Sequence, residues 1–200
     1  MYKDVNGDGK IDGGKNTVLD PGDRRIIGNT TPRYNFGLNL DAAYKGFDLK
    51  VFFQGTMKRD YMPGSGTTLF WGAVGYWQTN FFEPHLDYFR PENTSSGLGA
   101  NLSGYYPRPL EDGRNRYAQT RYMQNAAYAR LKNVTLGYTL PASLTQNMNV
   151  SNLRVFVSAE NLMTITSLKL YDPETIGVGN WDGSTYPLSK GFSCGLSVTL

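Results

Sequence analysis

The residues best suited to chemistry stand near the start of the chain, where oxygen-bearing side chains alternate with glycines. Asp4, Asn6 and Asp8 are two residues apart, Gly9 permits a sharp turn, and Asp12 follows. Ca²⁺ prefers several carboxylate, amide and carbonyl oxygens that converge from alternate positions of one loop. The pattern therefore predicts a calcium site whose ligands are Asp4, Asn6, Asp8, the carbonyl of Lys10, Asp12 and a closing carboxylate, Asp23.

This loop departs from an EF-hand at its twelfth position, which holds Lys15 instead of the bidentate glutamate. Residues 13–22 resemble an insertion, after which either Asp20 or Asp23 could close the site. The alternative is a surface turn without metal, because Asp, Asn and Gly favour turns in any case. Calcium is the interpretation we favour.

Aromatic side chains crowd residues 70–89 and could either stack on a glycan or a partner protein, or pack the loop on itself. The candidates for ligand or partner contact are Trp71, Tyr76, Trp77 and Phe82. His85 is the only histidine and has no evident triad partner, so we expect a solvated loop residue. No nucleophile motif, phosphate loop or catalytic carboxylate pair is visible, and we predict that the protein is not an enzyme.

Five segments alternate apolar and polar residues with the period of half-exposed strands. They begin near Arg33, Phe47, Arg121, Leu153 and Phe192. Lys45-Gly46 separates the first two segments, as in a tight hairpin. The polar faces carry Asp48, Lys50, Arg130 and Glu160, which would either contact substrate or form salt bridges. In the third segment the apolar set changes phase, which predicts a bulge at Lys132-Asn133.

The connections between these segments alternate in length. Residues 45–46 and 141–152 are short, whereas residues 59–119 and 167–190 are long and rich in Gly, Pro, Asn and aromatics. Short turns at one end and long loops at the other are typical of outer-membrane barrels, and a loop of about sixty residues is uncommon in a compact soluble domain. The sequence therefore predicts an all-β fold, an antiparallel meander of about five strands.

Composition is compatible with a barrel that looks only mildly hydrophobic. Apolar residues make up 40% of the chain and the mean hydropathy is −0.44, and no stretch approaches the roughly 18 apolar residues of a membrane helix. A spanning strand needs only about 9–11 residues with one apolar face. The net charge of +3 does not favour nucleic acid as a partner. Cys194 is the single cysteine, which excludes an internal disulfide. The first residues lack a secretory signal, so we expect a fragment.

Several stretches resemble, in order and spacing, the C-terminal part of the SusC/RagA-like, TonB-dependent outer-membrane transporters. They are DVNGDGKID (4–12), GDRRIIGN (22–29), TPRY (31–34), YKGFDL (44–49), FFQG (52–55), YPR (106–108), ARLKNVTLGYTLP (129–141), NLRV (152–155), AENL (159–162), YDPE (171–174) and YPLS (186–189). Each is weak alone, but together they extend over nearly all 200 residues.

The resemblance implies that residues 1–200 are the last five strands of a large transmembrane β-barrel with long extracellular loops, without the N-terminal strands and the plug domain. It implies a Gram-negative outer-membrane importer of glycans (oligosaccharides) or peptides. Expected partners are membrane lipid, a SusD-like lipoprotein and, through the N-terminal part, the TonB complex. A different class also fits the alternation, namely a secreted calcium-dependent carbohydrate-binding β-sandwich.

The end of the chain resembles the polar-x-Gly-x-x-apolar-x-apolar ending that barrel proteins present to the barrel assembly machinery. The matching residues are Ser193, Gly195, Val198 and Leu200. Family members usually end in an aromatic residue, so Leu200 departs from the common form. Gly195 would allow close backbone approach, with Val198 and Leu200 facing lipid. The alternative is an ordinary edge strand.

Overall fold

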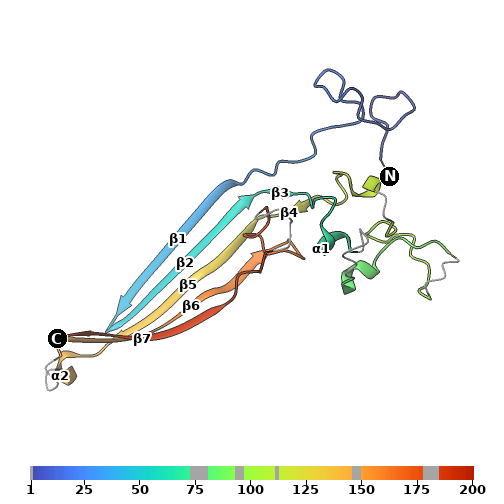
Figure 1. The fold of residues 1–200 in the computed structure, drawn as a ribbon. Helices are drawn as coiled ribbons and strands as arrows, with labels where there is room; N and C mark the ends of the chain where they lie inside the picture. Colours follow the sequence, from blue (N-terminus) through green and yellow to red (C-terminus); the bar gives the residue numbers. More distant parts are fainter. Residues whose placement is uncertain (1, 73–80, 93–96, 111–112, 146–149, 178–184) are drawn as a thin grey trace.

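The computed structural model is an open antiparallel sheet with the long loops gathered at one end (Figure 1). It describes residues 2–72, 81–92, 97–110, 113–145, 150–177 and 185–200. The five long strands lie in the order β1-β2-β5-β6-β7 and each pairs antiparallel with the next, which confirms the predicted meander. Their bounds are β1 Arg33–Tyr44, β2 Phe47–Lys58, β5 Tyr128–Thr139, β6 Asn152–Thr166 and β7 Gly191–Thr199.

The tight turn between β1 and β2 forms because two consecutive residues adopt positive φ. Lys45 has φ 49° and Gly46 has φ 86°, the conformation that a two-residue hairpin of right-handed twist requires. Beside the turn, the ring of Phe47 on β2 packs 4.6 Å from that of Tyr138 on β5. The hairpin fixes the register of the first two strands, as the sequence predicted.

The register gathers the apolar side chains on one face of the sheet. Leu40, Val51, Val134, Ala159 and Phe192 are consecutive cross-strand partners over all five strands. This face is open: the side chain of Phe192, for example, is 77% exposed. Within the described part of the chain, the other named sheet has two strands, β3 and β4, and lies among the loops. The opposite face of the large sheet carries the polar side chains.

The pairing of β5 and β6 is interrupted at one level of the sheet, where residues of both strands are skipped. Lys132 is skipped in the pairing of β5 with both of its neighbours, which confirms the predicted bulge. On β6, Asn161 and Leu162 are skipped as well, a bulge that the sequence did not predict. Asn161 has φ 52°, and its Nδ2 donates to the carbonyl of Ser189 just before β7. The β6 bulge thus helps to hold the start of the last strand.

The long loops gather at the far end of the sheet (Figure 1). Their buried side chains form a packed core of their own. The third strand was predicted to begin at Arg121, but β5 begins at Tyr128. The prediction was wrong because residues 121–127 turn into the loops, where Tyr122 is buried. The short elements there are β3 Asp60–Tyr61, paired with β4 Gln124–Asn125, helix α1 Thr68–Trp71, and the 3₁₀ turns η1 Glu83–Leu86 and η2 Gly113–Arg116.

The other end of the sheet holds the short connections. Helix α2, Ala142–Thr145, contacts β6 at this end, where the C-terminus also lies (Figure 1). None of the helices in the described ranges is long and apolar enough to cross a membrane.

Candidate functional site

An ion pair crosses the polar face near its short-turn end. Arg154 on β6 donates from Nε (2.8 Å) and Nη2 (2.5 Å) to the two carboxylate oxygens of Asp48 on β2. Strand β5 lies between these strands and presents Gly137, which pairs with Asp48. A Cβ at Gly137 would collide with both the carboxylate and the guanidinium. The missing side chain is therefore what allows the pair to form across β5.

A second glycine on the polar face makes room for an aromatic ring. Phe156 pairs with Gly195, and a ring carbon of Phe156 lies 2.5 Å from where a Cβ at Gly195 would stand. The guanidinium of Arg154 lies over the same ring, 5.0 Å from its centroid. The space at Gly195 is thus filled by the Phe156 side chain.

A third cluster ties the last long loop to the sheet. Residues 167–177, which we call the strap, carry Asp172 and Glu174. Nη2 of Arg130 on β5 donates to Asp172 over 2.7 Å, and Nζ of Lys132 donates to Glu174 over 2.9 Å. Arg130 is only 3% exposed and also donates from Nε to Thr164 on β6. Its Nη1 lies 3.2 Å from Glu174 without hydrogen-bond alignment. The strap is therefore held by two cations that balance two carboxylates.

Of the four charged residues predicted on the polar face, Asp48 and Arg130 form ion pairs. Their partners Arg154, Asp172 and Glu174 were not identified from the sequence. Arg154 is 106 residues from Asp48, and the two strap carboxylates lie about 40 residues from the cations that they bind, so no short-range spacing links them. One signal was available: a glycine inside a strand often marks a place where other atoms approach closely.

The predicted calcium loop lies at the same end as the long loops (Figure 1). The carboxylate of Asp4 accepts the backbone N–H groups of Gly7 (2.6 Å) and Gly9 (2.9 Å). Asp23 closes the segment by accepting the N–H groups of Val5 (2.6 Å) and Asp12 (2.9 Å). The hydrogen bond from Val5, and then that from Asp12, lower the pKa of the Asp23 carboxyl.

The remaining predicted ligands are also engaged with the loop itself. Asp8 accepts hydrogen bonds from the backbone of Lys10 (2.8 Å) and the amide of Asn6 (3.0 Å). In the ranges that the structure describes, no three or more His, Cys, Asp or Glu side chains are grouped so that they could hold a metal ion. Calcium binding would therefore require these carboxylates to turn from the backbone toward a common centre.

The loop aromatics mostly pack against one another. Phe70 and Trp71 lie edge to face at 4.8 Å, both are buried, and Nε1 of Trp71 donates to the carbonyl of Gly64 over 2.8 Å. The core of which they are part consists of Tyr61, Phe70, Trp71, Tyr106, Tyr122, Ala126, Leu168, Tyr171 and Ile176. Phe82 remains half-exposed. Tyr76 and Trp77 lie outside the described residues.

His85 is buried, so the prediction of a solvated histidine was wrong. Its side chain is 2% exposed and lies 5.2 Å from the ring of Tyr106. Nδ1 accepts the N–H of Phe82, while Nε2 lies 3.1 Å from the carbonyls of Leu69 and Phe70 and must carry the proton. Burial lowers the pKa of His85. The histidine fastens η1 to α1 in its neutral form.

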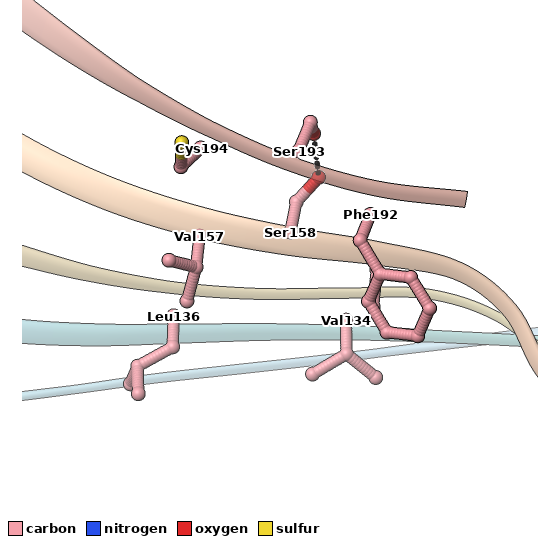
Figure 2. A pocket seen from close by; sticks show the side chains of 8 residues that line it. Val134, Leu136, Val157, Ser158, Phe192, Ser193 and Cys194 are labelled. Atoms are coloured by element: carbon pink, nitrogen blue, oxygen red, sulfur yellow. Dashed lines mark hydrogen bonds between the residues drawn. The ribbon is translucent and has the colours of Figure 1, made fainter.

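The residues of the predicted assembly signal lie on both faces of β7. The hydroxyl oxygens of Ser193 and Ser158 are 2.9 Å apart on the polar face (Figure 2). Val198 lies on the apolar face, and Leu200, just beyond the end of β7, is 90% exposed. On the apolar face, Val134, Leu136, Val157 and Phe192 line a shallow groove over β5–β7 (Figure 2). This groove is nearly all hydrocarbon and offers no polar anchor for a specific ligand.

Comparison with known proteins finds similar sequences and a similar fold among receptors and an importer. The chain is 29% identical over 211 aligned residues to TonB-dependent receptor P3 of Formosa agariphila, covering 99% of this chain and 18% of that protein. It is 25% identical to TonB-dependent receptor SusC of Bacteroides thetaiotaomicron, covering 99% and 17%. A solved structure of the RagAB peptide importer in its closed-closed state is 28% identical, with a TM-score of 0.62 over 87% of this chain and 18% of that one.

The chain is related to the SusC-like TonB-dependent receptors. Sequence and fold agree on this relationship, and the resemblance seen in the sequence is confirmed. No protein-family model matches the chain. The chain spans less than a fifth of the length of these receptors. The names of these relatives are those of receptors and an importer rather than of enzymes.

Proposed function

We propose that the chain forms part of the wall of an outer-membrane, TonB-dependent nutrient importer. The observation that carries the proposal is the apolar face of the five-stranded sheet. Its side chains are exposed, whereas the buried apolar core of the described residues lies entirely in the loops and the strap. A large exposed apolar surface marks an interaction site, and a barrel wall turns such a face to lipid. The relationship to TonB-dependent receptors supports the same conclusion.

The rival interpretation, a secreted carbohydrate-binding β-sandwich, needs a second sheet on the apolar face. In the described residues the five-stranded sheet is accompanied by the two-stranded β3–β4 sheet among the loops, and no second sheet covers the apolar face. The barrel proposal requires more strands to pair with the free edges of β1 and β7, since open edges are prone to aggregate. This chain alone would then neither close a pore nor transport.

A pair of neighbouring residues on opposite faces tests the proposal. Val157 is on the apolar face and Ser158 on the polar face of the same strand. In the full-length protein, Val157→Lys should cost about 2–4 kcal/mol near the membrane midplane and lower the outer-membrane level, while Ser158→Lys should be tolerated. Levels are measured by membrane fractionation and surface protease protection. Equal tolerance of both lysines, or a full-length protein that is soluble without detergent, would refute a lipid-facing wall.

As finer parts of the proposal, the importer takes up oligosaccharides or peptides, works with a SusD-like lipoprotein and is driven by the TonB complex. The supporting observation is the similarity to the RagAB peptide importer. Co-purification of the full-length protein from its own membranes with a lipoprotein, followed by mass spectrometry, tests the partnership. A receptor that purifies without a lipoprotein under mild detergent would contradict it.

We also propose that the loop formed by Asp4, Asn6, Asp8, Asp12 and Asp23 binds Ca²⁺ once the carboxylates turn toward the ion. Support comes from Asp23, which already joins both ends of the loop through the Val5 and Asp12 amides. Oxygen ligands from several positions of one loop are the donor set that Ca²⁺ prefers.

A further inference from the structure

An open pocket lies on the polar face, at the loop end of β1, β2 and β5. Its volume is about 670 Å³. The floor is formed by Asn35, Phe52, Gln54 and Tyr128, and the side wall by Pro173 and Glu174 of the strap. We call it the wall pocket. The residues come from three strands and one loop that are far apart in the sequence, so the fold is needed to assemble it.

The strap wall of the pocket is fixed in place and its charge is balanced. Arg130 binds Asp172 and Lys132 binds Glu174, on either side of Pro173. The buried Arg130 further donates to Thr164 on the neighbouring strand. Because each carboxylate of the strap already faces a cation, this wall offers little to attract an ionic ligand.

The floor combines one flat apolar ring with groups that both donate and accept hydrogen bonds. A ring carbon of Phe52 lies 3.3 Å from where a Cβ at Gly37 would stand, so the glycine leaves space for the ring. The hydroxyl of Thr56 donates to Oδ1 of Asn35 over 2.8 Å. This orients the amide, and Nδ2 of Asn35 has no partner among the described residues. Gln54 and Tyr128 add an amide and a phenol, whose side chains are hydrogen-bonded to each other and so are held in place on the floor.

An aromatic ring beside amides and hydroxyls suits a ligand that has an apolar ring face and many hydroxyl groups. We propose that the wall pocket binds a sugar unit of an oligosaccharide on its way through the importer. Arg59 also lines the pocket and is held by a hydrogen bond from its Nε to the carbonyl of Thr30. This inference rests on the proposed function and chooses oligosaccharide over peptide.

The test uses the full-length receptor in detergent micelles and isothermal calorimetry. The glycan probes are hexasaccharides with the repeating linkages of maltose, cellulose, laminarin, xylan and mannan. The peptide probe is a tryptic digest of casein. At least one hexasaccharide should bind. Phe52→Ala should weaken its binding about tenfold or more, as truncation of a central aromatic contact does, and Gln54→Leu should weaken it in the same direction. Phe53→Ala, which removes the neighbouring aromatic ring of β2 on the apolar face and outside the pocket, should leave affinity unchanged.

Each variant is first checked for its outer-membrane level, and Gln54→Leu, which keeps the volume, replaces Phe52→Ala if the latter fails to assemble. Binding of the casein digest that Phe52→Ala abolishes would overturn the sugar assignment, and so would a parent that binds no hexasaccharide. If neither variant alters hexasaccharide binding, the assignment of the sugar to the wall pocket fails, whereas the proposed importer function stands. A full-length protein outside the membrane would instead refute the proposed function.

Discussion

Gly137→Ala is expected to destabilise the protein by breaking the ion pair that crosses β5. The added Cβ would collide with the carboxylate of Asp48 and the guanidinium of Arg154. The two charged side chains are 24% and 27% exposed and share two hydrogen bonds. The loss of this bidentate pair should outweigh the gain of about 0.5–1 kcal/mol that alanine brings over glycine inside a strand.

To isolate the effect of the collision, Gly137→Ala is repeated in a variant that lacks both members of the ion pair. In the background Asp48→Ala with Arg154→Ala, Gly137→Ala should be neutral or should stabilise by about 0.5–1 kcal/mol, because glycine in a strand costs that much relative to alanine. The preference for alanine is the same in both backgrounds and cancels, so the two should differ by the whole contribution of the ion pair, a coupling expected only of residues in contact.

The assay is urea unfolding of the full-length protein in lipid vesicles, followed by tryptophan fluorescence. Gly191→Ala is the matched control, because the nearest atom to a Cβ there lies at an ordinary 3.6 Å. If Gly137→Ala shifts the free energy of unfolding equally in both backgrounds, the glycine does not act by admitting the ion pair, and the reasoning fails.

Four further changes probe other parts of the chain. Burial lowers the pKa of His85 below its usual 6.5, so the unfolded loops bind a proton that the folded core does not, and stability falls as pH drops below 6.5; the protection of the amides of residues 69–72 against hydrogen exchange, relative to their intrinsic exchange rates, should fall there in the parent but not in His85→Gln. Arg130→Met leaves the buried Asp172 carboxylate without its cation and should cost about 3–5 kcal/mol, seen as faster proteolysis within the strap; unchanged proteolysis would contradict its anchoring role. Leu200→Asp should block assembly and leave the protein degraded, whereas Leu200→Phe should reach the outer membrane at parental levels, as immunoblots of membrane fractions would show. Calorimetry should detect Ca²⁺ binding by the full-length protein and its strong loss in Asp8→Ala; no uptake by the parent would remove the calcium proposal.

The strands were predictable because period-two alternation is a local pattern, and Lys45-Gly46 is a strong hairpin signal. The bulge at Lys132 was also visible, since one extra residue shifts the phase of every apolar position beyond it. The double bulge at Asn161 was not. Two residues of β6 are left unpaired there, and an even number of extra residues keeps the apolar positions before and after the bulge on the same face.

The candidate sites were less predictable than the strands. Asp48 and Arg130 were recognised as inward charges, but their partners depend on which strands become neighbours and where the strap returns. His85 was expected in solvent because loops usually lie on the surface. Its burial follows from the aromatic residues of the loops, which supply enough apolar area for a core of their own.

That separate core bears on how receptors of this kind diversify. The core draws on residues 61–126 and on the strap, joined through contacts such as that of Tyr61 with Tyr171, whose ring centroids are 5.4 Å apart. The two segments therefore should be inherited together, since a recombination that exchanged one alone would leave unmatched packing surfaces. A chimera carrying both from a relative should fold on this wall, while single exchanges should not. Under the proposed function, the strands stay constant while the two loop segments change together with the cargo.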